Sequence, residues 1–209
     1  MIIRNSQKGF SLMELLIVIA IMLILLSVSL FDYNKFGKEI DLENATYAIA
    51  LAIRESQVYG INKALKKTDN PINTFGGDYG YGVFFSKRET GPANKSRLVF
   101  FVDSSTAPNN NKIFDGNCSG GSGDECYSQV SLNKGNHISD IKYYNNGSWT
   151  SVDSINLYFK RPNPDAVIKV NALDFGKERV RITITDSGNQ FFRCVEVGTS
   201  GDISIKRNC

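Results

Sequence analysis

The most uneven feature of the chain is a run of apolar residues close to its start. Residues 10–31 form a stretch of 22 with one charged side chain, Glu14. As a helix this stretch would extend for about 33 Å, enough to cross the hydrocarbon core of a bilayer. Arg4 and Lys8 precede the run, so the positive-inside rule predicts a single-pass anchor with a cytoplasmic N-terminus. The rest of the chain would then lie in the periplasm or outside the cell.

A secretory signal peptide is the alternative reading of a basic start followed by apolar residues. Its apolar region is shorter, however, and ends at a small-residue cleavage site. Here the run has full spanning length, and only a weak Ser27/Ser29 pair resembles such a site. We therefore expect the segment to be retained.

Helical periodicity continues beyond the apolar run. Apolar residues recur at steps of three and four, at Leu42, Ala45, Ile49, Ala52 and Ile53. This spacing predicts one helix from Phe10 to about Asn62, and residues 32–67 form the amphipathic continuation of the apolar segment. Its small, Ala-rich face would be buried on a sheet. Two helices broken near Asn34–Gly37 are the alternative.

The sequence pattern of residues 68–209 predicts a β domain. A loop with Pro71 and several glycines comes first, and short apolar or alternating runs bounded by turn clusters follow. The predicted strands are Tyr81–Phe85, Arg97–Val102, Ser128–Leu132, Ile138–Tyr144, Ser154–Phe159, Val167–Val170, Arg179–Thr185, Phe191–Val197 and Ile203–Ile205. The expected fold is α+β, a long N-terminal helix packed on an antiparallel β-sheet domain.

The four cysteines all follow the apolar run, on the side expected to leave the cytoplasm. An even number there favours disulfides in an oxidising compartment. Pairing Cys118 with Cys126 and Cys194 with Cys209 is the simplest of three connectivities. Free thiols or a zinc site remain alternatives, although no C-x-x-C spacing favours a metal.

Glu14 is the most informative single residue of the apolar run. A carboxylate in a spanning helix is costly unless it reaches the headgroups or a partner, although the first helical turn favours acidic groups. If the chain were cut after Gly9, the new amino group of Phe10 would lie four residues from Glu14. Pairing with that amine, in the same or a neighbouring copy, would fix the axial register between subunits.

The sequence Lys8-Gly9-Phe10-Ser11-Leu12-Met13-Glu14, with its unbroken apolar tail, resembles the class III signal of type IV prepilins and type II secretion pseudopilins. The resemblance implies that prepilin peptidase removes residues 1–9 by cleavage between Gly9 and Phe10. It also implies N-methylation of Phe10 and an assembly role for Glu14. Residues 10–31 would form the transmembrane and filament-core helix. The implied partners are other pilin or pseudopilin subunits, prepilin peptidase, the inner-membrane assembly platform and the membrane itself.

Two features favour a minor pilin or pseudopilin over a main subunit. Many major pilins carry a proline in the helix, and this chain has none before Pro71. The closing strands, with their Gly-containing turn before Ile203, resemble those of the GspH/FimT group of minor pseudopilins.

A DNA-binding minor pilin is the alternative function. Some FimT-like members bind DNA through a Gly-Arg-x-Arg motif, but here Gly201 is followed by Asp202. The weak candidates are Lys206 and Arg207. Arg179 and Arg181 alternate on one predicted strand. We expect them to lie on a solvent-exposed face of that strand rather than to form a row of DNA contacts. With a net charge of +3, the composition gives no support for nucleic acid.

No cofactor, metal site or catalytic set is predicted. Asp115, Asp124 and Glu125 lie in a polar loop and are oxygen ligands of the type calcium uses, but they lack EF-hand spacing. A solvated loop is the favoured reading. The chain is therefore expected to be a non-enzymatic subunit.

Overall fold

The computed structural model describes residues 9–62, 80–103, 112–116, 118–119, 125–160, 163–170 and 178–209, without the side chains of residues 28–32, 34 and 62. The chain divides into two compact units, Met1–Glu39 and Ile40–Cys209. The predicted leader lies outside the described residues except for Gly9.

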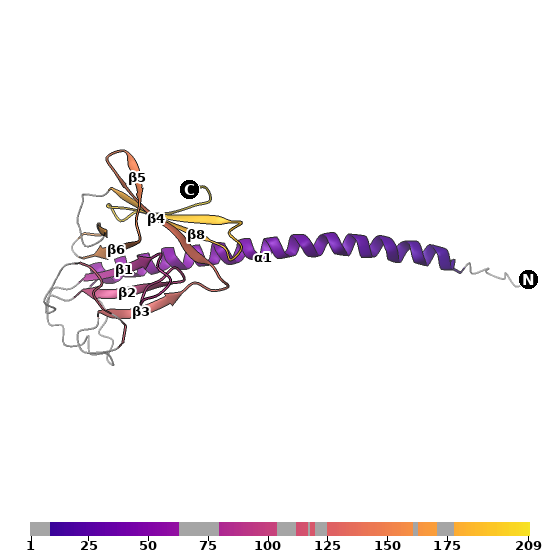
Figure 1. Ribbon diagram of the computed structural model, residues 1–209, viewed down its shortest axis with the longest axis horizontal. Helices are drawn as coiled ribbons and strands as arrows, with labels where there is room; N and C mark the ends of the chain where they lie inside the picture. Colours follow the sequence, from indigo (N-terminus) through magenta and orange to yellow (C-terminus); the bar gives the residue numbers. More distant parts are fainter. Residues whose placement is uncertain are drawn as a thin grey trace, which may run out of the picture. The chain divides into compact units, whose positions relative to one another are not determined.

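One long helix, α1 (Leu12–Asn62), accounts for all the described helical residues (Figure 1). It continues through Asn34–Gly37, so the alternative of two separate helices is wrong. Leu42, Ala45, Ile49, Ala52 and Ile53 are all buried, which confirms the predicted periodicity in its second half. The helical end at Asn62 also agrees with the sequence.

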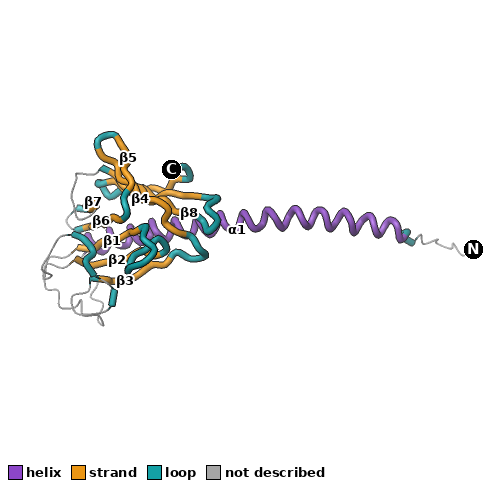
Figure 2. The backbone as a smooth tube through the Cα atoms, in the orientation of Figure 1, coloured by secondary structure: helices purple, strands orange, loops and turns teal. Residues whose placement is uncertain are grey.

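The β region consists of two five-stranded antiparallel sheets (Figure 2). The first has the strand order β3-β2-β1-β6-β7, and the second has the order β10-β9-β8-β4-β5. The strands of the first sheet are β1 (Gly80–Ser86), β2 (Arg97–Asp103), β3 (Cys126–Ser131), β6 (Ser154–Phe159) and β7 (Ala166–Val170). Those of the second are β4 (His137–Asn145), β5 (Ser148–Ser151), β8 (Arg179–Thr185), β9 (Phe192–Gly198) and β10 (Ile203–Lys206).

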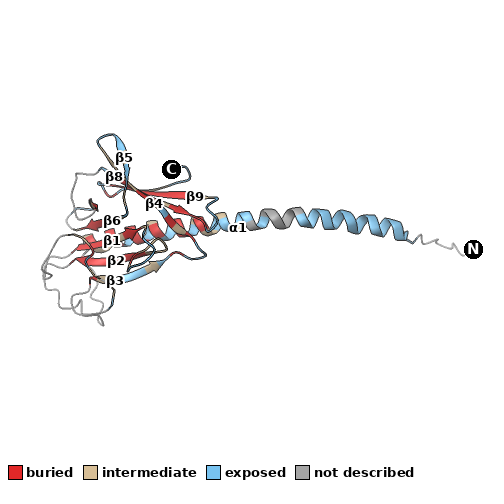
Figure 3. Cartoon of the chain, in the orientation of Figure 1, coloured by how far each residue is buried: buried red, intermediate tan, exposed pale blue. Residues whose placement is uncertain are grey.

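The main core joins the C-terminal part of α1 to both sheets. Ile49 and Ile53 of the helix belong to the same buried cluster as Leu157 of the first sheet and Ile182 and Val195 of the second. Figure 3 shows buried and exposed positions following one another along this part of α1, beside the sheets. The fold is therefore α+β, with the helix packed on sheets as predicted.

Small residues allow the helix to approach the first sheet closely. A Cβ atom added at Gly60 would lie 2.5 Å from the carbonyl oxygen of Phe159 in β6. No real Cβ atom occupies such a position, so only glycine fits between helix and strand.

A second, smaller core covers the opposite face of the first sheet. Along β2, Phe100 points into the main core and Phe101 into the second cluster, as strand alternation requires. Phe114, from the segment after β2, closes this cluster and is buried. Its backbone N–H donates to the Asn156 side-chain oxygen at 3.0 Å, which fixes the segment to β6.

All nine predicted strands are present, but the sequence missed one strand and one sheet. The missed strand is β5, which pairs with β4 through a turn at Asn146 and Gly147. The sequence predicted a single sheet, but the strands form two. The prediction was wrong because period-two alternation identifies strands without showing which sheet they join.

Candidate functional site

The candidate assembly segment begins where helix α1 begins. The Ser11 hydroxyl oxygen accepts a hydrogen bond from the backbone N–H of Met13 at 3.3 Å. The Ser11 carbonyl oxygen accepts the backbone N–H of Leu15 at 3.2 Å. Ser11 is therefore the N-cap of α1, two residues after Gly9.

Glu14 occupies the first turn of the helix. With Ser11 at the N-cap, it is the third helical residue, and Ser11-x-x-Glu14 is the pattern of a capping box. The sequence predicted that the first helical turn favours an acidic group at Glu14, but the capping box was not predicted. The pattern gives Glu14 a second role, because an acidic side chain there stabilises the positive end of the helix dipole. The helix has its own start signal even without residues 1–9.

The surface of this segment is almost entirely apolar. Phe10 is 87% exposed, and the large side chains between Leu12 and Leu26 are between 48% and 77% exposed. A contiguous apolar surface of this kind is typical of a contact with a membrane or with other protein. Figure 3 shows the uninterrupted exposure along this part of α1.

Over the described residues, no helix combines the length and apolar character needed to cross a membrane. The predicted spanning segment, residues 10–31, includes side chains outside the described set, and it stays a prediction.

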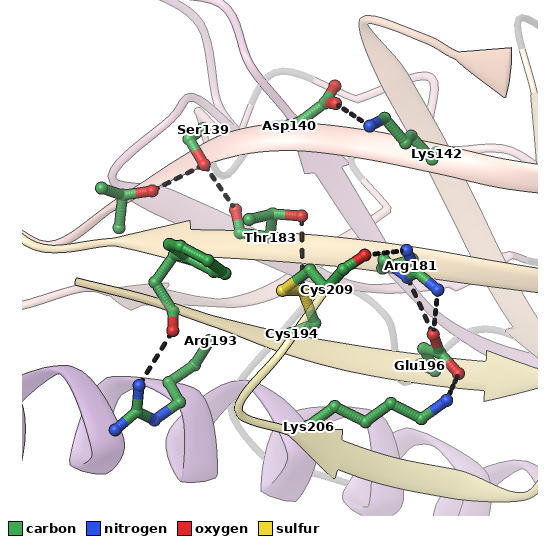
Figure 4. The surroundings of a disulfide bond; sticks show 12 residues. Ser139, Asp140, Lys142, Arg181, Thr183, Arg193, Cys194, Glu196, Lys206 and Cys209 are labelled. Atoms are coloured by element: carbon green, nitrogen blue, oxygen red, sulfur yellow. Dashed lines mark hydrogen bonds and ion pairs between the residues drawn. A yellow bond between two sulfur atoms is a disulfide. The ribbon is translucent and has the colours of Figure 1, made fainter. Parts of the chain in front are cut away.

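Lys206, one of the two weak DNA-binding candidates, belongs to an ion cluster on the second sheet (Figure 4). Its ammonium nitrogen lies 2.6 Å from Oε2 of Glu196, a carboxylate that is 1% exposed. The Arg181 guanidinium reaches the other oxygen of Glu196 at 2.7 Å, and Arg179 lies 3.5 Å from Oε2. Arg207 is exposed. Lys206 therefore forms an ion pair with a buried carboxylate of the same chain.

The cluster sets the ionisation of Glu196. Burial alone would raise the pKa of this carboxyl, but the hydrogen bonds and charges of Lys206 and Arg181 outweigh burial and lower the pKa below its ordinary value. The alternating pair Arg179 and Arg181 therefore neutralises a buried acid, which the sequence did not predict.

Arg181 also connects the cluster to the last disulfide. Its guanidinium stacks over the Trp149 ring at 4.1 Å from the centroid and donates to the carbonyl oxygen of Cys209. Cys209 is bonded to Cys194, a buried residue of β9. Together these contacts hold the segment after β10 against the second sheet (Figure 4).

The other disulfide joins Cys118 to Cys126. The two disulfides expected from the cysteine count are present, and they have the simplest of the three connectivities. All four cysteines are therefore used in structural bonds.

Of the loop carboxylates considered for calcium, Glu125 has a structural contact. Glu125 is buried, and its Oε2 accepts the backbone N–H of Asp115 at 3.0 Å. Asp124 lies outside the described residues. Within the described ranges, no three His, Cys, Asp or Glu side chains are grouped so as to hold a metal ion.

Comparison with known proteins identifies the N-terminal segment only. The family model described as "Prokaryotic N-terminal methylation motif" matches residues 4–30. No curated protein matches the chain, and no solved structure does. The matched range includes Gly9, Phe10, Glu14 and the exposed apolar stretch. The class III signal of residues 4–30 supports a type IV pilin-like protein that prepilin peptidase processes, a structural and non-catalytic subunit that assembles with other pilin subunits.

Proposed function

We propose that this chain is a minor pilin or pseudopilin, a non-catalytic subunit of a type IV pilus or a type II secretion pseudopilus. The observation that carries the proposal is the methylation motif at residues 4–30, fused to a helix whose apolar side chains are exposed up to Leu26. The same helix packs on the sheets beyond Ile40. One element thus joins an apolar assembly segment to a folded domain.

The proposal also assigns the chain a minor rather than a major role in the filament, with the GspH/FimT group as the candidate subgroup. Its support is the helix itself, since α1 extends from Leu12 to Asn62 without a proline and without a break. In the proposed pathway the apolar segment anchors the processed chain in the cytoplasmic membrane, with residues 40–209 outside the cytoplasm. The assembly platform then transfers the chain from the membrane into the filament.

The proposal predicts a specific maturation. Co-expression with a prepilin peptidase should remove residues 1–9 and add one methyl group to the amine of Phe10. Mass spectrometry of the intact chain measures both changes. The matched control is Gly9→Val, which changes the residue before the cut and should leave the chain full length. An unprocessed wild-type chain beside an active peptidase would disprove the proposal.

Assembly is tested separately from processing. Glu14→Gln removes the charge but keeps the size and hydrogen-bonding capacity of the side chain. We expect this variant to be cleaved like the wild type but to be depleted from sheared filaments. Equal incorporation of the variant would show that Glu14 has only its helix-capping role.

The contacts of Lys206 do not favour a DNA-binding surface. Lys206 pairs with buried Glu196 at 2.6 Å, and a cation so engaged contributes little to a phosphate-binding surface. A gel-shift titration of the wild type and of the Lys206→Ala/Arg207→Ala variant tests this directly. Salt-sensitive binding that disappears in the double variant would favour a DNA-binding subunit.

A further inference from the structure

The second sheet carries a hollow on the face that points away from the main core. Along β8, Val180 and Ile182 point into that core, so Arg179 and Arg181 lie on the opposite face. The hollow has a volume of about 330 Å³, within the size range of small-molecule sites. We call it the sheet hollow. It is lined by the ion cluster around Glu196 and by Tyr144, Trp149 and Glu178.

Two members of the ion cluster form the fixed part of the sheet hollow. Arg181 donates through Nε to Oε1 of Glu196 at 2.8 Å, and it also donates to the carbonyl oxygen of Cys209. The same guanidinium group stacks over the Trp149 ring. Glu196 is 1% exposed and is held by this arginine and by Lys206 (Figure 4). These contacts position the hollow without leaving Arg181 free for a ligand.

Arg179 is engaged much less. Its guanidinium group lies 3.5 Å from Oε2 of Glu196 and 3.7 Å from Oδ2 of Asp202, and it makes no hydrogen bond among the described residues. The side chain is 43% exposed. A guanidinium group presents five N–H donors in a fork that matches the two oxygens of a carboxylate. Arg179 therefore has the donors to bind a carboxylate ligand through two hydrogen bonds.

A free acceptor lies next to this donor. Glu178 is exposed, and its carboxylate has no hydrogen bond or ion pair among the described residues. Its backbone is fixed, because its N–H donates to the carbonyl oxygen of Tyr144 at 3.2 Å and its carbonyl oxygen accepts the N–H of Thr199 at 3.1 Å. Lys206 has one ion-pair partner and is 44% exposed, so two of its three N–H donors remain. Because a hydroxyl group both donates and accepts, Glu178 and Lys206 together suit a ligand with several hydroxyls.

Two aromatic rings border the sheet hollow. Tyr144 and Trp149 are paired across β4 and β5, with their ring centroids 5.2 Å apart and their planes at 55°. Both residues are partly exposed, so some ring surface remains open to a ligand. The C–H groups of a sugar ring pack on aromatic surface of this kind, whereas a small inorganic anion makes no use of it.

We propose that the sheet hollow binds an acidic saccharide, in which a sugar ring carries a carboxylate. The ligand carboxylate pairs with Arg179, and the ring packs on Trp149. The ring hydroxyls donate to Glu178 and accept from Lys206. Every residue of the site belongs to residues 40–209, so binding does not depend on filament assembly.

The charges of the sheet hollow favour this class of ligand over nucleic acid. Its lining has three cations and two carboxylates, a net charge of only +1. Glu178 would repel the phosphates on either side of a bound nucleotide, because like charges at short range are unfavourable. A single carboxylate on an otherwise neutral sugar avoids that repulsion.

Tryptophan fluorescence tests the proposal directly, because Trp149 is the single tryptophan of the chain. Titration of the detergent-solubilised chain with trigalacturonate should give a saturable change in emission. Maltotriose, a neutral trisaccharide of similar size, should bind at least about tenfold more weakly, the effect of one lost charge-assisted hydrogen bond. Equal binding of the two would overturn the role of the carboxylate. The absence of any change with trigalacturonate, in fluorescence and in calorimetry, would overturn the site.

Substitution of Arg179 tests which side chain holds the carboxylate. Arg179→Gln should weaken trigalacturonate binding at least about tenfold. Glu196 keeps Arg181 and Lys206 in this variant, so the urea midpoint should show that the fold is retained. The matched control is Lys142→Gln, on the same face but outside the hollow, and it should bind like the wild type. Equal affinity of Arg179→Gln and wild type would overturn the proposed binding mode.

Two competitors distinguish the acidic saccharide from other anions. Inorganic phosphate should not displace trigalacturonate at the same concentration, and displacement would show a simple anion site instead. Oligothymidylate should bind more weakly than trigalacturonate, and tighter, strongly salt-dependent binding would show a nucleic-acid site instead. Either result would overturn the proposed ligand class. Filament assembly is decided by the processing and shearing experiments, so the two proposals can fail separately.

Discussion

The side-chain amide of Gln57 donates a hydrogen bond to the carbonyl oxygen of Gly201, at 3.1 Å and across 144 positions of sequence. The same nitrogen donates to the carbonyl oxygen of Pro164 at 2.9 Å. Gln57 is 2% exposed. Gly201 has a φ of +80°, and a Cβ atom there would lie 2.4 Å from the Gln57 amide nitrogen. One buried side chain thus fixes the helix, the β6–β7 connection and the β9–β10 turn together.

Replacing Gln57 by leucine should therefore destabilise residues 40–209. The two carbonyl groups would lose their buried donor, at a cost of roughly 2–4 kcal/mol in the free energy of unfolding. Urea unfolding of the detergent-solubilised chain, followed by circular dichroism, measures the change. Asn44→Leu, at an exposed position of the same helix, should change stability by less than about 0.5 kcal/mol. Equal midpoints for Gln57→Leu and wild type would contradict this assignment.

The ion cluster predicts a pH-dependent effect of Glu196→Gln. At pH 7 the variant leaves Arg179, Arg181 and Lys206 around a neutral amide. It should lose about 1–3 kcal/mol, less than for a fully buried pair because Arg179 and Lys206 reach solvent. The pKa of Glu196 is lowered by folding from its ordinary value of 4.5. Its stabilising effect is therefore present above pH 4.5 and is lost as the pH falls through the folded-state pKa.

The wild type and the Glu196→Gln variant should consequently converge in stability below pH 4.5. Urea midpoints measured from pH 7 down to pH 3 test this. Glu178→Gln, at the exposed rim of the cluster, is the control and should follow the wild type. A constant difference at every pH would show that the loss is one of packing rather than of charge.

Asp103 should respond with the opposite sign. It is fully buried, and burial raises its pKa above 3.8 although the backbone N–H of Lys112 bonds to Oδ2 at 2.7 Å. Oδ1 has no hydrogen-bond partner among the described residues. Asp103 thus contributes stability that is present below pH 3.8 and is lost as the pH rises through the folded-state pKa.

Asp103→Asn should therefore raise the urea midpoint at pH 7, and the gain should shrink as the pH falls through the folded-state pKa and vanish below 3.8. Asp153→Asn, an exposed carboxylate before β6, serves as the control and should have no effect. A lower midpoint for Asp103→Asn at pH 7 would mean that the ionised carboxylate has a stabilising partner.

Removal of the Cys194–Cys209 disulfide should cost about 3 kcal/mol, the loop-entropy value for a separation of 15 residues. The shorter Cys118–Cys126 loop, with a separation of 8, should cost about 2.5 kcal/mol. Thermal unfolding of the paired Cys→Ser variants measures both. Only loss of Cys194–Cys209 should increase hydrogen exchange in β9 and β10. Equal exchange in the two variants would contradict the local role of that bond.

Much of the fold could be predicted because the chain has strong periodic signals. The bounds of β6 and β8 were predicted to the residue, since both strands are long runs with turn residues on either side. β5 was missed because Ser148–Ser151 has no apolar alternation. Its signal was the preceding Asn146-Gly147 pair, whose φ values of 48° and 84° suit a two-residue hairpin turn.

The candidate site was less predictable from the sequence than the fold. The Gly9–Phe10 junction is a local pattern and was visible at once. The burial of Glu196 was not, because three cations from β8 and β10 come together around it only when the strand order is known. The Ser11-x-x-Glu14 capping box is also a local pattern, and the sequence alone is sufficient to predict it.

The order in which the strands join their sheets has a consequence for how the domain forms during export. The chain enters the first sheet, crosses to the second for β4 and β5, returns for β6 and β7, and ends in the second. In each sheet an inner strand therefore completes its pairing late: β1 pairs with β6, and β4 pairs with β8 only in the last third of the chain. Such high contact order makes folding slow and late. In the proposed topology residues 40–209 cross the membrane in chain order, so part of α1 would stay uncovered until β9 (Phe192–Gly198) had followed β8.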